Sequence, residues 1–254
     1  MLAVGGNAIA NNQKRFTMKL SVPIFKLKRE AKTLSRKNNI PLHAALDHIA
    51  IEHGFKKWSH LSSVEANQIP SDRILRSLNL GDLLLLAARP GHGKTVLALE
   101  LMLKAIELGK QGFFFTLDYT ELDIWYQVKN LRVNPDKYAK KICVDTSDNI
   151  CAEHISNRLL QTPNQAFVVI DYLQLLDQKR QNLTLEVQVE QLAQLAKQSN
   201  SIIIVLSQIH RSYELSAKSI PELEDVKLPN PANLAQFNKT CFLHNGCIKF
   251  SDAA

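Results

Sequence analysis

Short apolar segments alternate with amphipathic segments over the last three quarters of the chain. The apolar segments have the composition of strands buried on both faces, and they lie at residues 82–88, 112–117, 142–145, 167–170 and 202–206. Helical periodicity separates or follows them at 95–108, 121–131, 153–160 and 185–197. Strands that alternate with helices predict an α/β fold, in which helices cover both faces of a mostly parallel sheet.

The first quarter of the chain follows a helical pattern without strands. Apolar residues recur at helical spacing from Ile24 to Leu34, a second helix is expected over 41–53, and a short third helix begins near Phe55. Residues 1–20 carry little pattern and are expected to be flexible, and a linker is expected over residues 64–73.

The change of pattern predicts two parts. A basic helical module is expected over residues 1–66, and a larger α/β domain over residues 67–254. The chain after Arg211 looks irregular, except that Asn245-Gly246 between apolar flanks predicts a hairpin at about 240–250.

The charge of the chain is concentrated in the first part. The formal net charge is +7, and residues 1–66 hold all of this excess, with 11 Lys and Arg against 4 Asp and Glu. Clustered cations favour an anionic partner, most often nucleic acid. The alternative is a solvated helix face with surplus lysines, and the sequence leaves both open.

Composition limits the cellular setting. The hydrophobic and charged fractions, 45% and 22%, are those of globular proteins, and four cysteines do not form a secreted disulfide framework. The first residues lack the apolar stretch of a signal peptide, and no apolar run approaches the roughly 18 residues of a membrane span. We therefore expect a cytoplasmic protein that does not enter a membrane.

The strand at 82–88 runs directly into a phosphate-loop pattern and then into a helix. The candidate nucleotide-binding residues are Ala88, Arg89, Pro90, Gly91, His92, Gly93, Lys94 and Thr95. Gly93 allows the backbone to wrap closely around phosphates, and the helix start offers N–H groups to an anion. In this pattern Lys94 contacts the β and γ phosphates of ATP, and Thr95 holds Mg²⁺. The pattern normally begins with glycine, which is Ala88 here.

Two further strands end in polar residues. FVVIDYLQLL places Asp171 at the end of a buried strand, where a carboxylate can hold magnesium and balance phosphate charge. IIIVLSQIHRSYE ends its strand in Ser207-Gln208, where Gln208 is suited to sense the γ-phosphate. Each signal is weak alone, because many buried strands end in a polar residue.

Taken in order, ARPGHGKT, VVIDYLQLL and LSQIHRSYE resemble the RecA-like P-loop ATPase domain of DnaB-type replicative helicases. The similarity covers about residues 73–214, and the related clock and recombination ATPases are the nearest alternatives. DnaB-like domains commonly have Ala followed by Arg-Pro at the start of the loop, which matches Ala88. The resemblance implies a RecA-like fold, ATP and Mg²⁺ as ligands, single-stranded DNA as a partner and a homo-oligomer.

The chain also departs from that family. The family's glutamate general base after the second strand corresponds to Asp118, and Glu121 is a less suitable substitute. Asp is one methylene shorter, so its carboxylate would lie about 1 Å farther from the attacking water. We identify no late strand with the family's Lys and Arg finger, since Lys227, Lys239 and Lys249 lack a matching context. The basic module replaces the family's N-terminal domain.

The leading hypothesis is an ATP hydrolase of DnaB-helicase type that acts on DNA. Its catalytic residues would be Lys94, Asp118, Asp171 and Gln208, with Thr95 and Asp171 as magnesium ligands. One alternative is an ATP-gated adaptor that hydrolyses slowly or not at all. Another is a regulatory ATPase whose partner is a protein only.

Overall fold

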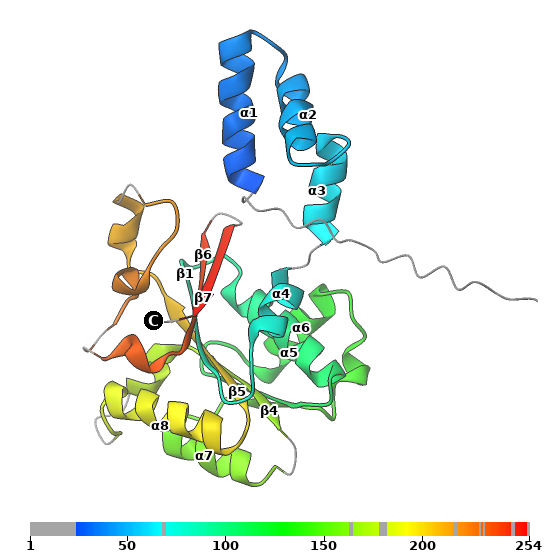
Figure 1. Ribbon diagram of the computed structural model, residues 1–254. Helices are drawn as coiled ribbons and strands as arrows, with labels where there is room; N and C mark the ends of the chain where they lie inside the picture. Colours follow the sequence, from blue (N-terminus) through cyan, green and yellow to red (C-terminus); the bar gives the residue numbers. More distant parts are fainter. Residues whose placement is uncertain are drawn as a thin grey trace, which may run out of the picture. The chain divides into compact units, whose positions relative to one another are not determined.

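The computed structural model describes residues 24–67, 70–162, 165–177, 182–215, 218–228, 230, 232–244 and 247–252. The flexible start expected at residues 1–20 lies outside these residues. Contacts divide the chain into two units, Met1–Ile69 and Pro70–Ala254 (Figure 1). Each unit is described by itself.

The first unit is a small helical module with its own apolar core. Its helices are α1 (Ile24–Asn38), α2 (Leu42–Glu52) and α3 (Trp58–Asn67). The buried residues come from all three helices and the turn before α3: Leu27, Ala31, Ala45, Ile49, Ala50, Phe55 and Leu61. Gly54, which follows α2, has a φ of 83°, a conformation that glycine adopts without steric cost. The spacing of apolar residues therefore predicts these helices correctly.

The linker expected at residues 64–73 is wrong for most of its length. Helix α3 continues to Asn67, and a further helix, α4, runs from Pro70 to Ser77. Proline suits the first position of a helix, and Asp72 in the first turn complements the helix dipole. Ile74 and Leu78 of α4 are buried in the larger unit, and this burial stabilises a helix with few apolar residues.

The second unit contains a seven-stranded sheet with the order β3-β2-β4-β5-β1-β6-β7. Its strands are β1 (Leu83–Ala88), β2 (Gln111–Thr116), β3 (Ile142–Asp145), β4 (Ala166–Asp171), β5 (Ile202–Gln208), β6 (Lys239–His244) and β7 (Cys247–Asp252). All neighbouring pairs are parallel except β6 and β7, which are antiparallel. The expected α/β class with a mostly parallel sheet is confirmed.

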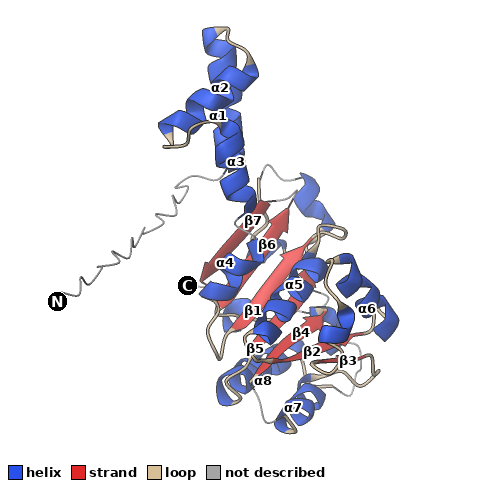
Figure 2. Ribbon diagram, turned by 90° about the vertical axis from the view of Figure 1, so that its right-hand side faces the viewer, coloured by secondary structure: helices blue, strands red, loops and turns tan. Residues whose placement is uncertain are grey.

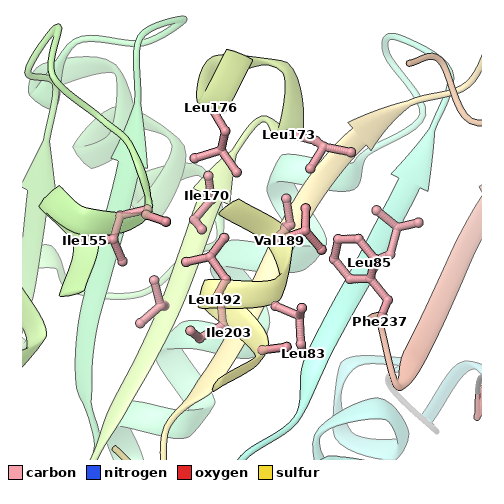
Figure 3. Close-up of a cluster of buried hydrophobic side chains, with 14 of the residues drawn as sticks. Leu83, Leu85, Ile155, Ile170, Leu173, Leu176, Val189, Leu192, Ile203 and Phe237 are labelled. Carbon is pink, nitrogen blue, oxygen red and sulfur yellow. The ribbon is translucent and has the colours of Figure 1, made fainter. Parts of the chain in front are cut away.

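Helices cover both faces of this sheet (Figure 2). The described helices are α5 (Lys94–Glu107), α6 (Glu121–Asn130), α7 (Ala152–Leu160) and α8 (Leu185–Gln198), beside α4. Alternate residues of β1 enter different clusters: Leu84 and Leu86 pack with α4, α5 and α6. Leu83 and Leu85 pack with α7 and α8 on the other face (Figure 3). Side chains of a strand alternate between faces, so one strand serves both cores.

None of the helices that the structure describes is long and apolar enough to cross a membrane.

The chain after Arg211 contributes to the core although it has little regular structure before β6. Its short 3₁₀ turns are η3 (Arg211–Leu215), η4 (Leu223–Asp225) and η5 (Leu234–Gln236). Phe237, directly after η5, is fully buried and packs against the face that α8 covers (Figure 3). This segment then continues into β6, which pairs with β1 in the sheet.

Replacement of Phe237 by alanine is expected to destabilise the protein by about 3–5 kcal/mol, because it removes a large buried ring and leaves a cavity. For a unit of this size the thermal midpoint would fall by about 10 °C. The matched control is Leu215→Ala in the same part of the chain, since Leu215 is 92% exposed. Equal midpoints for the two variants would show that the tail is not part of the core.

Candidate active site

The carboxyl ends of β1, β2, β4 and β5 lie at one edge of the sheet because these strands run parallel. The register brings specific ends together: Ala88 lies opposite Gln208, and Thr116 lies opposite Asp171. In open α/β sheets, ligands bind outside the carboxyl ends of the strands. The sheet therefore gathers residues from three distant sequence motifs at the edge where a ligand is expected.

The loop after β1 has the backbone shape that close contact with an anion requires. Gly91 and Gly93 have φ values of 78° and 85°, in the left-handed region that favours glycine. A Cβ atom at either position would meet no heavy atom within 4 Å, so the space beside both glycines is open. Helix α5 begins at Lys94, directly after Gly93, and its first N–H groups are available to a phosphate.

Thr95 and Asp171 form the buried centre of the site. The Thr95 hydroxyl donates a hydrogen bond of 2.9 Å to Oδ2 of Asp171, across 76 residues of sequence. Asp171 is 1% exposed and Thr95 is 8% exposed. Oδ1 of Asp171 is also buried and has no hydrogen-bond partner among the residues that the structure describes. A buried polar atom without a partner is costly, and it often marks a ligand site.

The protonation of Asp171 reflects this burial. Desolvation raises the pKa of the carboxyl above its ordinary value, because burial disfavours the charged form. The positive charge of Lys94 and the Thr95 hydrogen bond act in the opposite direction, and the negative charge of Asp118 adds to the increase. Lys94 and Asp118 are thus both close enough to Asp171 to act on its pKa.

The donor set at this centre fits a hard divalent cation. A threonine hydroxyl and an aspartate carboxylate supply the oxygen ligands that Mg²⁺ prefers, usually together with water and phosphate oxygens. The unpartnered Oδ1 of Asp171 is the atom that would gain such a contact. Thr95 and Asp171 are therefore the residues that could hold magnesium.

Asp118 lies two residues beyond the end of β2 and is exposed. Its backbone N–H donates to the Thr116 hydroxyl at 3.1 Å, which fixes the turn that carries it. Glu121 is the first residue of α6, and its carboxylate accepts a hydrogen bond of 3.3 Å from the Trp125 ring N–H. Of these two carboxylates, the Asp118 side chain is the one that acts electrostatically on Asp171.

Gln208 ends β5 beside the start of the phosphate loop. Its neighbour Ile209 donates its N–H to the Ala88 carbonyl at 3.1 Å, and the Gln208 carbonyl accepts from Lys227 N–H at 2.7 Å. Gln208 itself is half-buried. The backbone bonds hold this strand end against the loop, so a change in either segment would be felt by the other.

The structure adds a set of contacts that the sequence motifs do not indicate. The Arg89 guanidinium contacts one Glu214 oxygen through Nε and Nη2, both at 2.9 Å, and donates to the Ile209 carbonyl at 3.1 Å. The His92 ring stacks on the His244 ring with centroids 5.2 Å apart. The loop is thereby tied to η3 and to the end of β6. No local pattern could reveal these pairs, because the partners lie more than 100 residues apart.

The lysines of the tail are engaged within the unit. Lys239 on β6 pairs with Asp252, and Lys249 on β7 pairs with Glu222 at 2.9 Å. Strands are therefore present in this part of the chain, but these two lysines are in contact with carboxylates of the same unit. The structure does not bring them to the Thr95 and Asp171 pair through any contact between described residues.

Comparison with known families supports the similarity that the motifs indicate. Residues 125–229 match the DnaB-like helicase C terminal domain, a range that includes Asp171 and Gln208 and begins after the phosphate loop.

Several curated proteins are related at low identity. A probable replicative DNA helicase of Guillardia theta is 24% identical over 230 residues, which are 77% of this chain and 38% of that protein. The replicative DNA helicase DnaB of Mycoplasma genitalium is 26% identical over 202 residues, covering 66% and 43% of the two chains. A probable plasmid replicative DNA helicase of Chlamydia muridarum is 29% identical over 178 residues, covering 58% and 39%. The chain spans less than half the length of these relatives.

Solved structures show the same fold. One of them, an isolated ATPase domain, aligns with a TM-score of 0.54 at 19% identity, over 66% of this chain and 71% of that one. A DnaB-like replicative helicase, solved in a study of its interactions with primase, aligns with a TM-score of 0.56 at 16% identity, over 86% and 66%. The similarity to DnaB-type replicative helicases that the motifs predict is thus confirmed by the family match, by curated relatives and by a shared RecA-like fold.

Proposed function

We propose that this chain is an ATP-binding and ATP-hydrolysing RecA-like motor of DnaB-helicase type that acts on single-stranded DNA. The observation that carries the proposal is the buried contact between Thr95 and Asp171, directly after Lys94 at the start of α5. A carboxylate that is 1% exposed, with one oxygen unpartnered, is expensive to maintain for folding alone. A nucleotide with its metal ion would supply the missing contact.

Each residue at this edge has a proposed role. Lys94 and the N–H groups that begin α5 bind the phosphates, and Thr95 and Asp171 hold the magnesium ion. The ion supplies positive charge that offsets the negative charge of the phosphates. Asp118 orients the water that attacks the γ-phosphorus, the bond to the β-phosphate oxygen breaks, and ADP and phosphate leave. Gln208 contacts the γ-phosphate and transmits its presence to the segment after β5.

A homo-oligomer is part of the same proposal. The described lysines of the tail that could reach out from β6 and β7 are paired inside their own unit. An additional cation for the γ-phosphate would then come from a neighbouring copy of the chain, as in enzymes whose arginine finger is supplied in trans.

The first test is steady-state ATP hydrolysis with and without single-stranded DNA, beside a Lys94→Ala variant. We expect turnover that DNA stimulates, and a loss of about a thousandfold in the variant, because the charge on the β and γ phosphates is removed. A coupled assay for ADP release measures both.

Two outcomes would contradict parts of the proposal. Tight ATP binding without turnover in either condition would favour the ATP-gated adaptor, an alternative that the exposed and shortened carboxylate of Asp118 makes specific. Turnover that DNA does not change, with no effect of DNA on ATP affinity, would favour a regulatory ATPase that works on a protein partner.

A further inference from the structure

Helix α1 carries its cations on the side away from the core of its own unit. Leu27 and Ala31 are fully buried, and Leu34 packs against them. At about 100° per residue, these three positions form one face of the helix. The exposed cations fall on the opposite half of the helix, and they are Lys28, Arg29, Lys32, Arg36 and Lys37.

These cations are not explained by pairing within the protein. None of the five forms an ion pair with a carboxylate in the part of the chain that the structure describes. Glu30 is the single acidic residue of α1, so the helix has a strong surplus of positive charge. The basic face of α1 is therefore solvent-facing and open to an anionic partner.

The stability of the helix does not explain them either. Lys28, Lys32 and Arg36 stand four residues apart, and like charges at this spacing destabilise an isolated helix by about 0.2–0.5 kcal/mol per pair. The first turn holds no acidic residue, and cations near a helix N-terminus are unfavourable with the dipole. Arg36 and Lys37 in the last turn are favourable with it. The charges in the first half of α1 thus cost folding energy.

We propose that this basic face, made by the exposed cations of α1, binds the phosphate backbone of single-stranded DNA. The row formed by Lys28, Lys32 and Arg36 advances about 6 Å with each step along the helix, so its charges can engage successive phosphates of one strand. The contact is to the backbone and reads no sequence. The choice of DNA over another polyanion rests on the proposed function. The binding itself is separate from the nucleotide site.

The test is the affinity of the full chain for a fluorescently labelled oligothymidylate, measured by anisotropy without nucleotide at salt concentrations from about 50 to 200 mM. The test variant is the triple substitution Lys28→Gln, Lys32→Gln and Arg36→Gln. Its matched control removes three exposed charges from the second unit, Lys129→Gln, Lys140→Gln and Lys141→Gln. Circular dichroism confirms that both variants keep their helices.

We expect the α1 variant to bind about tenfold more weakly or worse, and its slope of log affinity against log salt to shrink by about 2 units, since three phosphate contacts are lost. The control should match the wild type in both. Equal affinity and slope for the α1 variant and the wild type would overturn the proposal, as would absence of DNA binding by the wild type.

The identity of the polyanion is tested in the same assay. Tighter binding to RNA of the same length, or to phosphatidylserine vesicles, would overturn the assignment to DNA. Because no nucleotide is present, these outcomes do not depend on whether the chain hydrolyses ATP. A failure of the α1 proposal is therefore distinguishable from a failure of the proposed ATPase activity.

Discussion

Replacement of Asp171 by asparagine is expected to lower ATP turnover by about a hundredfold or more and, in the same protein, to raise the thermal midpoint without nucleotide. Turnover falls because the substitution removes the negative charge and one oxygen from the proposed magnesium site. The side chain stays nearly isosteric, so the fold around Thr95 is retained.

The effect on stability follows from the raised pKa of Asp171. A carboxyl whose pKa is higher in the folded protein than in the unfolded chain is costly wherever it is ionised, so its cost appears as pH rises through the unfolded value near 3.8 and persists at neutral pH. Asparagine carries no charge and avoids this cost. The midpoint should rise by about 2–4 °C for each kcal/mol relieved.

Differential scanning calorimetry at pH 7 with and without Mg-ATP measures the second effect. The variant should melt higher than the wild type alone, but it should lose the increase that Mg-ATP gives the wild type. The control is Asp136→Asn, an exposed carboxylate far along the chain from the site, which should change neither quantity. A variant that melts lower and hydrolyses ATP normally would show that Asp171 serves the fold and not the nucleotide.

Substitution of Asp118 by glutamate is expected to raise kcat, by as much as about a hundredfold. The added methylene would bring the carboxylate about 1 Å closer to the proposed water, and misplacement on that scale can cost about that factor. Because Asp118 is exposed, the longer side chain has room at the end of β2. Asp118→Asn should lower turnover, since it removes the proton acceptor.

Turnover of the two Asp118 variants is compared with that of Glu121→Gln under saturating ATP. Glu121 begins α6 and accepts a hydrogen bond from Trp125, so its substitution should leave kcat near the wild-type value. Loss of turnover in Glu121→Gln together with no change in either Asp118 variant would exchange the roles of these two carboxylates.

Much of the site can be predicted from sequence because its residues lie at the ends of buried parallel strands. The run DLLLLAA predicts β1, and FVVID predicts β4 with Asp171 at its end. Once two strands are parallel members of one sheet, their carboxyl ends share an edge, so the approach of Thr95 to Asp171 follows from the pattern. The observed hydrogen bond of 2.9 Å gives that approach its geometry.

Other features needed the tertiary structure because the local pattern carries little of their cause. Helix α4 has few apolar residues, and its helical state depends on burial of Ile74 and Leu78 in the second unit. Phe237 belongs to the core although the chain around it is irregular, since a 3₁₀ turn has no periodicity to read.

The sequence by itself determined the α/β class, the two-part division of charge, and the order of the motifs that resemble a DnaB-type ATPase. Only the tertiary structure decided that Arg89 contacts Glu214 and that His92 stacks on His244. It also decided that the cations of α1 face away from a separate apolar core. The physical reason is that hydrophobic period reports which face of an element is buried, whereas contacts between distant loops depend on how the packed elements direct the chain.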